Sequence, residues 1–335
     1  MAIYKAYAAN GAGQPLTAVE RELPELQQSQ VVIDVQYCGV CHSDLSMLDN
    51  EWGLSQFPLV PGHEVVGKVS AVGAKVHNIE VGQAVGLGWN SDYCHTCSDC
   101  MSGDHNLCGD AEITMMGRDG GFAEKVVADA SAVMPIPSKL DPKAAGPLLC
   151  AGITVFNPLV QFDIKPTDKV AVIGIGGLGH LAIQFMKAWG CEVTAFTSSE
   201  EKKKEAMEFG ASDTINSRDP EDIAKAANRF DYIISTVGAK LDWNLYLSTL
   251  KAKGRLHFVG VTTEPLDISV IPMIFGQKTV SASPVGSPVN IKRMLDFAAH
   301  HDIKPAIELY KFDDINEAIE RVKSGQARYR VVLER

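Results

Sequence analysis

The sequence predicts an α/β protein that combines a doubly wound parallel sheet with a second, mainly β region. Up to about Pro147, short β patterns are separated by Gly, Pro and Asx residues, and long amphipathic helices are scarce. From Lys169 onward, strand patterns alternate with helical patterns, which is typical of βαβ units on a parallel sheet. A glycine-rich turn directly follows the first of these strands. These observations predict two regions of different architecture.

The composition is that of a globular protein. The chain has 335 residues, of which 46% are hydrophobic and 21% charged, enough for two or three domains. Its net charge of −10 argues against nucleic acid and anionic membrane as partners, since both require a basic face. We find no apolar run suited to a signal peptide or a membrane span. We therefore expect a cytoplasmic protein with no nucleic-acid or membrane partner.

Individual elements follow from the residue patterns. In the first region we expect strands at 31–37, 64–71, 84–87 and 123–127. In the second region the expected strands carry the sequences KVAVIGIG, EVTAFTSS, DTIN, DYIISTV and RLHFVGV, with helices between them. The first of these helices has an apolar face made of Leu178, Leu181, Ala182, Phe185, Met186 and Trp189. The C-terminal segment predicts a helix at 289–300 and a strand at 329–333.

Four cysteines with the spacing C-x2-C-x2-C-x7-C lie in a segment rich in Ser, Asp, Asn and Gly: Cys94, Cys97, Cys100 and Cys108. Four thiolates so close in sequence can surround a tetrahedral Zn²⁺ and leave no position for water. The pattern predicts a closed, structural zinc site. An Fe–S cluster also uses four cysteines, and a loop of unliganded or disulfide-linked cysteines is the alternative without metal.

A second metal site is indicated by Cys41, His63 and Cys150. Cys41 follows directly on an apolar strand, His63 follows Gly62, and Cys150 lies in an apolar run. Two thiolates and one imidazole leave a fourth zinc position open for water or substrate. Spacing alone supports this set only weakly, because a lone His is commonly structural and a Cys in an apolar run commonly packs in the core.

A dinucleotide-binding turn is predicted by G-x-G-x-x-G at residues 174–179, directly after a strand pattern and at the start of the amphipathic helix. Glycines permit the tight turn, close approach of the backbone to a pyrophosphate and close packing of helix on strand, while the helix N-terminus favours the anion. The alternative is a Gly-rich turn with no ligand. The residues expected here are Gly174, Gly176, Gly177, Leu178 and Gly179.

The choice between NAD and NADP is expected at the end of the second strand, where an acidic residue would bind the ribose 2′-hydroxyl of NAD. This strand ends in Thr197, Ser198 and Ser199, and Lys202 follows one helical turn later. Hydroxyls and a cation suit a 2′-phosphate, so we expect NADP(H) to be favoured over NAD(H). The alternative is that the lysines form a solvated helix face and the hydroxyls only cap the helix.

Taken together, the motifs resemble those of the zinc-dependent medium-chain alcohol dehydrogenases, and most of all the cinnamyl-alcohol-dehydrogenase-like branch. The resemblance rests on GVCHSD at 39–44, PGHE at 61–64, the four-cysteine loop, Cys150 shortly before Thr154, and GIGGLG at 174–179. The motifs occur in the right order, and the resemblance covers essentially the whole chain.

The resemblance implies a GroES-like catalytic domain of residues 1–149 and 288–335, which holds both zinc sites, and a Rossmann dinucleotide-binding domain of residues 150–287. It implies an NADP(H)-preferring, zinc-dependent alcohol dehydrogenase or aldehyde reductase. Such an enzyme moves a hydride reversibly between nicotinamide C4 and a primary alcohol or aldehyde, either aromatic or medium aliphatic. It would carry two zinc ions per chain and form a homodimer or tetramer.

The resemblance also assigns roles to residues around the open set of Cys41, His63 and Cys150, which it makes the catalytic zinc ligands. Glu64 is the carboxylate that can approach the metal when ligands exchange. Asp44 orients the zinc-bound imidazole, a role with clear physical sense. Ser43 exchanges the substrate proton, and Trp52 is a candidate for narrowing the substrate pocket, although an aromatic side chain in an apolar core is as readily a packing residue.

The cofactor-binding positions that the resemblance implies are His42, Thr154, the glycine turn, the 2′-phosphate residues Thr197, Ser198, Ser199 and Lys202, and Arg330. Arg330 would reach the pyrophosphate, with Arg328 as a rival. One departure concerns the proton route: many relatives have a histidine three residues after the hydroxyl, where this chain has Ser46. Water or His42 could then carry the proton to bulk solvent.

Three other functions compete with this one, and the two cysteine sets argue against the second of them. One is an NAD-dependent zinc alcohol dehydrogenase that acts on short aliphatic alcohols. A zinc-free quinone or enoyl reductase of the same fold would lack both cysteine sets. A zinc-ribbon interaction protein would use the four-cysteine loop for docking, but it would leave the dinucleotide turn unexplained.

Overall fold

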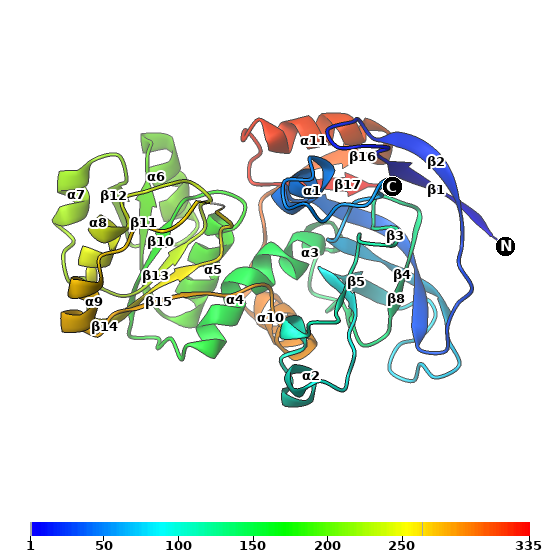
Figure 1. Ribbon diagram of the computed structural model, residues 1–335, viewed down its shortest axis with the longest axis horizontal. Helices are drawn as coiled ribbons and strands as arrows, with labels where there is room; N and C mark the ends of the chain where they lie inside the picture. The colour runs from blue at the N-terminus through cyan, green and yellow to red at the C-terminus, as the bar shows by residue number, and fades with distance from the viewer. Residues whose placement is uncertain (1, 263) are drawn as a thin grey trace. The chain divides into compact units, whose positions relative to one another are not determined.

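The computed structural model describes residues 2–262 and 264–335 and divides them into two compact units. One unit contains the chain up to Ile153 together with Val285–Arg335, and the other contains Thr154–Pro284 (Figure 1). The sequence placed these boundaries after residues 149 and 287. Each unit has its own sheet, so each is described by itself.

The first unit is built on a seven-stranded, largely antiparallel sheet. Its central strand β3 is apolar on both faces, and most of its side chains are buried. The path of the sheet is β16 (Ile307–Lys311), β17 (Arg330–Glu334), β3 (Gln30–Val40), β4 (Val65–Val72), β5 (Ala84–Leu87) and β9 (Val133–Pro135), with β8 (Lys125–Asp129) also paired to β3.

Two small ribbons and several short helices complete this unit. The ribbons are β1 (Ile3–Ala8) with β2 (Thr17–Glu22), and β6 (Asn90–Asp92) with β7 (Glu112–Ile113). The helices are α1 (His42–Leu48), α2 (Ser98–Ser102), α3 (Pro142–Ala145), α10 (Pro288–His301) and α11 (Ile315–Lys323), with 3-10 turns at His105–Leu107, Gly146–Leu149 and Phe312–Asp314.

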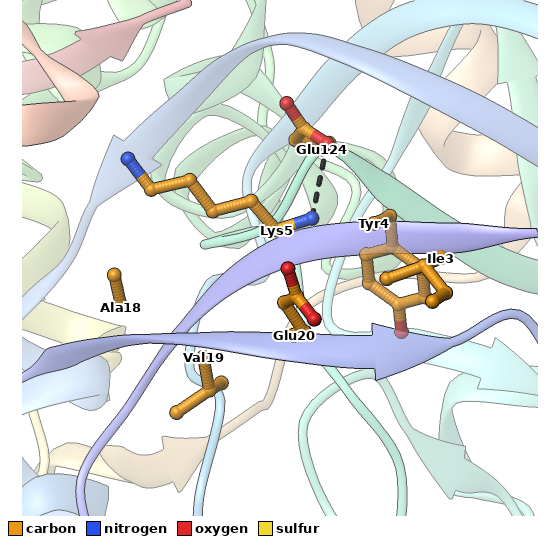
Figure 2. A pocket seen from close by; sticks show the side chains of 7 residues that line it. All are labelled: Ile3, Tyr4, Lys5, Ala18, Val19, Glu20 and Glu124. Atoms are coloured by element: carbon orange, nitrogen blue, oxygen red, sulfur yellow. Dashed lines mark hydrogen bonds between the residues drawn. The ribbon is translucent and has the colours of Figure 1, made fainter.

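The β1–β2 ribbon carries a shallow hollow on its surface (Figure 2). Lys5 and Glu20 line it, and the backbone N–H of Lys5 donates to Glu124 Oε2 at 3.0 Å. None of the residues expected at the metal or cofactor sites lines this hollow.

The second unit is a six-stranded parallel sheet in the order β12-β11-β10-β13-β14-β15, the doubly wound order in which the first strand lies at the centre. The strands are β10 (Lys169–Ile173), β11 (Glu192–Thr197), β12 (Asp213–Asn216), β13 (Phe230–Ser235), β14 (Leu250–Phe258) and β15 (Thr279–Ala282). Strand β10 is buried from its second residue onward, as expected for a parallel strand covered on both faces.

Helices connect these strands, as Figure 1 shows. They are α5 (Gly179–Trp189), α6 (Glu200–Glu208), α7 (Pro220–Ala224), α8 (Trp243–Ser248) and α9 (Val270–Gly276). Helix α4 (Ala151–Gln161) leads into this unit from the first one. The apolar face predicted for α5 is buried against β10 and β11: Leu181, Ala182, Phe185 and Met186 are all fully buried.

The expected fold class is confirmed, and the expected strands are found within a few residues of their predicted bounds. The C-terminal segment was predicted incompletely, because β16 and α11 were not assigned. The strand β16 has mostly half-exposed side chains, so it lacks the clean alternation that identifies a strand in sequence.

Among the described residues, no single helix has the length and hydropathy to span a membrane. The pair Pro142–Leu149 and Ala151–Gln161 reaches that length only together and is bent by 54°.

Candidate active site and metal centres

Cys41 lies where strand β3 ends and helix α1 begins. It is the N-cap residue of α1, with extended backbone geometry, and the side chain of Asp44 caps the helix in return by accepting from the Cys41 N–H at 2.9 Å. Asp44 thus fixes the turn that directs the Cys41 thiol. An acidic residue in the first turn also suits the positive end of the helix.

Asp44 also holds the second ligand-bearing loop. Its Oδ1 accepts from the backbone N–H of Gly62 at 3.0 Å and from Nδ1 of His63 at 2.9 Å. Asp44 and His63 are both fully buried. Because a carboxylate only accepts, Nδ1 of His63 carries a proton, and Nε2 is the ring nitrogen that can bind a metal once it has lost its own.

The predicted ligands converge on one point. His63 Nε2 lies 3.3 Å from Cys150 Sγ, and the two sulfur atoms of Cys41 and Cys150 lie 3.9 Å apart. Tetrahedral zinc with bonds of about 2.0–2.3 Å separates its ligand atoms by about 3.5–3.8 Å. A disulfide would bring the sulfurs to about 2.05 Å. The three side chains therefore fit one zinc ion.

Glu64 is the fourth member of this cluster. It is fully buried, its Oε1 is paired with the Nη2 of Arg330, and its Oε2 has no hydrogen-bond partner within the described chain. Gly39 makes room for this carboxylate, since a Cβ there would lie 1.9 Å from Glu64 Oε2. A buried carboxylate oxygen left without a partner beside the thiols is available to a metal that changes ligands.

Burial and mutual contacts shift the pKa values of the four side chains in this cluster. Burial raises the pKa of Glu64 to about 7, against the opposing effect of Arg330. The hydrogen bond between Cys150 and Cys41 lowers the pKa of the Cys41 thiol well below its usual value and raises that of Cys150. Burial opposes protonation of His63, but Asp44 raises its pKa well above normal. The raised pKa values keep protons on Cys150 and His63, and a metal cation would displace these protons on binding.

The four-cysteine loop forms a second cluster, whose ligand atoms all lie within 4.8 Å of one another. Cys97 is the N-cap of helix α2 and accepts from the N–H of Cys100 at 3.4 Å, while its own N–H donates to Cys94 Sγ at 3.3 Å. Cys94 and Cys100 Sγ are 3.9 Å apart. Hydrogen bonds from the backbone N–H groups of Thr96 and Cys97 lower the pKa of Cys94 to about 6. Four thiols in this arrangement fit a closed zinc site.

Trp89 is a site residue that the sequence analysis missed. Its ring meets the ring of His63 edge-on, with centroids 5.0 Å apart. Trp52, which the sequence analysis named, packs edge-on against Trp89 with ring centroids 6.2 Å apart. Trp89 therefore lies between Trp52 and His63. Trp89 follows strand β5 by two positions and has no motif of its own, so nothing local identified it.

The glycine turn of the second unit has the features of a pyrophosphate cradle. Gly174 has φ +86°, and a Cβ on Gly179 would lie 1.9 Å from the carbonyl oxygen of Gly174, so both positions require glycine. A Cβ on Gly176 would meet nothing within 4 Å. Gly177 and Leu178 complete the turn before α5. The space at Gly176 suits a ligand that approaches the backbone closely.

At the tip of β11, Thr197 is buried and its hydroxyl has no hydrogen-bond partner among the described residues. Ser198 is half-buried. Ser199 caps α6 by accepting from the N–H of Lys202 at 3.2 Å, and a contact of this hydroxyl with a 2′-phosphate stays a prediction. Lys203 is paired with Glu200 at 2.6 Å, and no ion pair of Lys202 is found in the described chain.

Three further predicted residues are Thr154 in the second unit and His42 and Arg330 in the first. Thr154 is buried in helix α4, and His42 is exposed at the start of α1. The guanidinium of Arg330 is buried and directed to Glu64 rather than to solvent. A contact of Arg330 with a pyrophosphate stays a prediction.

A pair of substitutions separates the roles of the glycines. Gly176→Ala is expected to leave the unfolding midpoint unchanged but to weaken NADPH binding about tenfold, because the added methyl occupies the space of the pyrophosphate. Gly179→Ala is expected to destabilise the protein by about 1–3 kcal/mol, because its Cβ collides with backbone. Thermal unfolding and NADPH fluorescence titration measure both effects. Equal NADPH affinity in Gly176→Ala and the unaltered protein would contradict the assignment.

Comparison with known proteins supports the same class. Residues 27–138 match the family described as alcohol dehydrogenase GroES-like domain, and residues 177–300 match zinc-binding dehydrogenase. The aldehyde reductase AdhA of Synechocystis sp. is 60% identical over 329 residues, which cover 98% of each chain. The NADP-dependent alcohol dehydrogenase C 1 of Mycolicibacterium smegmatis is 38% identical and covers 100% of this chain and 98% of its own.

The solved structure of a cinnamyl alcohol dehydrogenase from Sorghum bicolor superposes with a TM-score of 0.95 at 37% identity, over 99% of this chain and 98% of that one. The chain therefore belongs to the zinc-containing medium-chain alcohol dehydrogenases, which confirms the resemblance noted in the sequence. It is a zinc-dependent oxidoreductase of the alcohol dehydrogenase and aldehyde reductase type, close to the cinnamyl alcohol dehydrogenases and the AdhA aldehyde reductases.

Proposed function

We propose that this enzyme uses NADP(H) in preference to NAD(H) and converts primary alcohols and aldehydes, aromatic or medium aliphatic, at the Cys41–His63–Cys150 site. The observation that carries the cofactor choice is the tip of β11. It ends in the buried, unpartnered hydroxyl of Thr197 where an NAD enzyme would have a carboxylate. The name of the similar NADP-dependent alcohol dehydrogenase agrees with this cofactor choice, and the name of the similar aldehyde reductase agrees with the proposed reaction.

The chain's own residues prepare the site for both reaction directions. Zinc bound there would supply a Lewis acid that polarises the substrate oxygen, and NADPH would supply the hydride. Asp44 holds the Cys41 turn and His63 at fixed positions, so two of the three proposed zinc ligands are placed before a metal binds. Ser43 would donate the proton that an aldehyde oxygen needs on reduction and take it back on alcohol oxidation. Its Oγ lies 3.9 Å from Cys41 Sγ.

The substrate class follows from the aromatic side chains next to His63. Trp89 touches the His63 ring, and Trp52 extends the same surface. Both are half-buried and belong to the edge of the core of the first unit. Apolar ring surface of this kind beside the reacting carbonyl would suit an aromatic ring or an alkyl chain.

Replacing Thr197 by aspartate tests the cofactor choice. The carboxylate repels a 2′-phosphate and accepts from a 2′-hydroxyl, so kcat/KM with NADPH should fall and that with NADH should rise, for a combined change of at least about a hundredfold in the ratio. Initial rates with both cofactors and a panel of aromatic, medium and short aliphatic aldehydes measure it. Unchanged selectivity would sink the assignment, and NADH preference in the unaltered protein would favour the NAD-dependent alternative.

We propose further that two copies of the chain associate through the edge of the parallel sheet. Strand β15 lies at that edge, with one side of its backbone unpaired in the sheet order. The helix before it exposes a row of apolar side chains: Val270 (63%), Ile271 (68%), Ile274 (66%) and Phe275 (87%). So large an apolar surface beside an open edge suits a second copy of the same chain.

Phe275→Asp should convert this dimer into a monomer, because it places a charge in the middle of the apolar contact. Light scattering after size exclusion measures the mass. Val81→Asp, at another exposed apolar side chain (62%), is the matched control and should leave the dimer intact. If the Phe275→Asp protein keeps the mass of a dimer, another surface forms the contact.

The eight cysteines support a reducing compartment, for which we propose the cytoplasm. All of them are free thiols in the structure, and six belong to the two metal clusters.

A further inference from the structure

Ser46 stands at the position where the family resemblance leads us to expect the histidine of a proton relay. This residue is one turn beyond Ser43 on helix α1 and is 3% exposed. Its hydroxyl donates to Glu51 Oε2 at 2.6 Å, a short bond for a neutral donor and a carboxylate. The backbone N–H of Glu51 donates to the carbonyl oxygen of Ser46 at 2.9 Å, so two hydrogen bonds join these residues.

Glu51 connects the buried Ser46 hydroxyl to the protein surface. It follows the end of α1, and its side chain is exposed, whereas Ser46 is buried. Ser43 and Ser46 stand three positions apart on one helix, a spacing that brings side chains within about 5–6 Å of one another. One ordered water spans such a gap with two hydrogen bonds of about 2.8 Å. A water in this gap would connect Ser43 to the Ser46 hydroxyl, which itself contacts the exposed carboxylate of Glu51.

We propose that Glu51 is the solvent end of the proton relay in this chain, with Ser46 as its buried link, in place of the histidine that relatives carry. This inference rests on the proposed role of Ser43 as the group that exchanges the substrate proton.

The number of protons is conserved at every step of the proposed relay. In alcohol oxidation, Ser43 takes the hydroxyl proton of the substrate and releases its own to the bridging water. The water passes a proton to Ser46, and Ser46 passes its own to the Glu51 carboxylate, which releases it to solvent. Each hydroxyl gives one proton and receives one. The Ser46 to Glu51 bond is oriented for this direction, and aldehyde reduction runs the same chain inward.

Other charged groups near this turn have different partners. Asp49 pairs with Lys323 of helix α11 at 3.5 Å, so the nearest carboxylate on the same turn is used in an exposed ion pair. His42 is exposed at the other end of the helix. Among these groups, Glu51 is the one in direct contact with the buried Ser46.

The test compares Glu51→Gln with the matched control Asp49→Asn. Gln keeps the hydrogen-bond acceptor for Ser46 but cannot carry a proton. Glu51→Gln should lower kcat about tenfold or more with KM unchanged, and raise the solvent deuterium isotope effect. A small buffer acid such as imidazolium should restore its rate, and Glu51→Asp should retain most of it. Asp49→Asn should match the unaltered enzyme. Zinc content and unfolding midpoint, measured without cofactor, should be equal in all variants.

Each outcome decides the proposal. Lower kcat with buffer rescue and a larger isotope effect supports the relay. A Glu51→Gln enzyme with unchanged rate and isotope effect overturns it, and so does a loss of rate that no buffer acid restores, since that would be a structural effect. A His42→Gln variant that alone shows the rescue would assign the exit to His42. If Ser43→Ala keeps full turnover, the proposed role of Ser43 fails instead, which separates that failure from a failure at Glu51.

Discussion

Replacing Cys41 with serine is expected to lower the zinc content from about two ions per chain to about one and to abolish turnover. The Cys41 sulfur is one of three ligand atoms of the open cluster, 3.9 Å from Cys150 Sγ, and a neutral serine hydroxyl binds zinc far more weakly than a thiolate. Polarisation of the substrate by the metal provides several kcal/mol, so aldehyde reduction should fall by about a thousandfold or more. Metal analysis and NADPH oxidation measure the two effects.

Cys191→Ser is the matched control for this prediction. Cys191 is a buried thiol in the second unit. Its S–H donates a hydrogen bond to the carbonyl oxygen of Lys165 at 3.3 Å, and a serine hydroxyl can make the same contact. This variant should keep both zinc ions and its activity. Full turnover in Cys41→Ser with one zinc remaining would refute the role of the open site.

Asp44→Asn is expected to reduce zinc affinity or turnover by about 10- to 100-fold, although no metal ligand is changed. The carboxylate accepts from the Cys41 N–H, the Gly62 N–H and the His63 Nδ1–H, all within 3.0 Å. An amide offers one acceptor oxygen and turns its NH₂ toward the remaining donors. With these groups fully buried, the mismatch should also cost about 1–3 kcal/mol of stability.

The effect of Asp44→Asn is measured by zinc titration against a chelator and by kcat/KM. Asp49→Asn serves as control, because its exposed ion pair with Lys323 contributes about 0–1 kcal/mol at most. Equal zinc affinity in Asp44→Asn and in the control would show that His63 needs no orienting partner.

The sequence identified the two metal clusters with unequal certainty, for a physical reason. The ligands of the four-cysteine loop lie within fifteen residues, so their spacing alone predicts a closed site. The open site draws on three distant segments, and only the family resemblance joined Cys41 and His63 to Cys150. The structure brings these atoms together because Asp44 links the first two segments.

Other contacts of the site had no signal in the sequence. Glu64 and Arg330 are separated by 266 positions, and their pairing depends on strand β17 lying next to β3. The role of Gly39 follows from that pairing, since its missing side chain makes room for Glu64. Trp89 approaches His63 through tertiary packing alone. Local patterns report periodicity and spacing, but not which distant strands become neighbours.

The central claim is that one chain holds an open and a closed zinc site and reduces aldehydes with NADPH. Zinc analysis of the purified protein, combined with aldehyde-dependent NADPH oxidation on the same sample, tests it most directly. We predict about two zinc ions per chain together with turnover, because both clusters have complete ligand sets. One zinc ion per chain and no NADPH oxidation with any aldehyde would contradict the account.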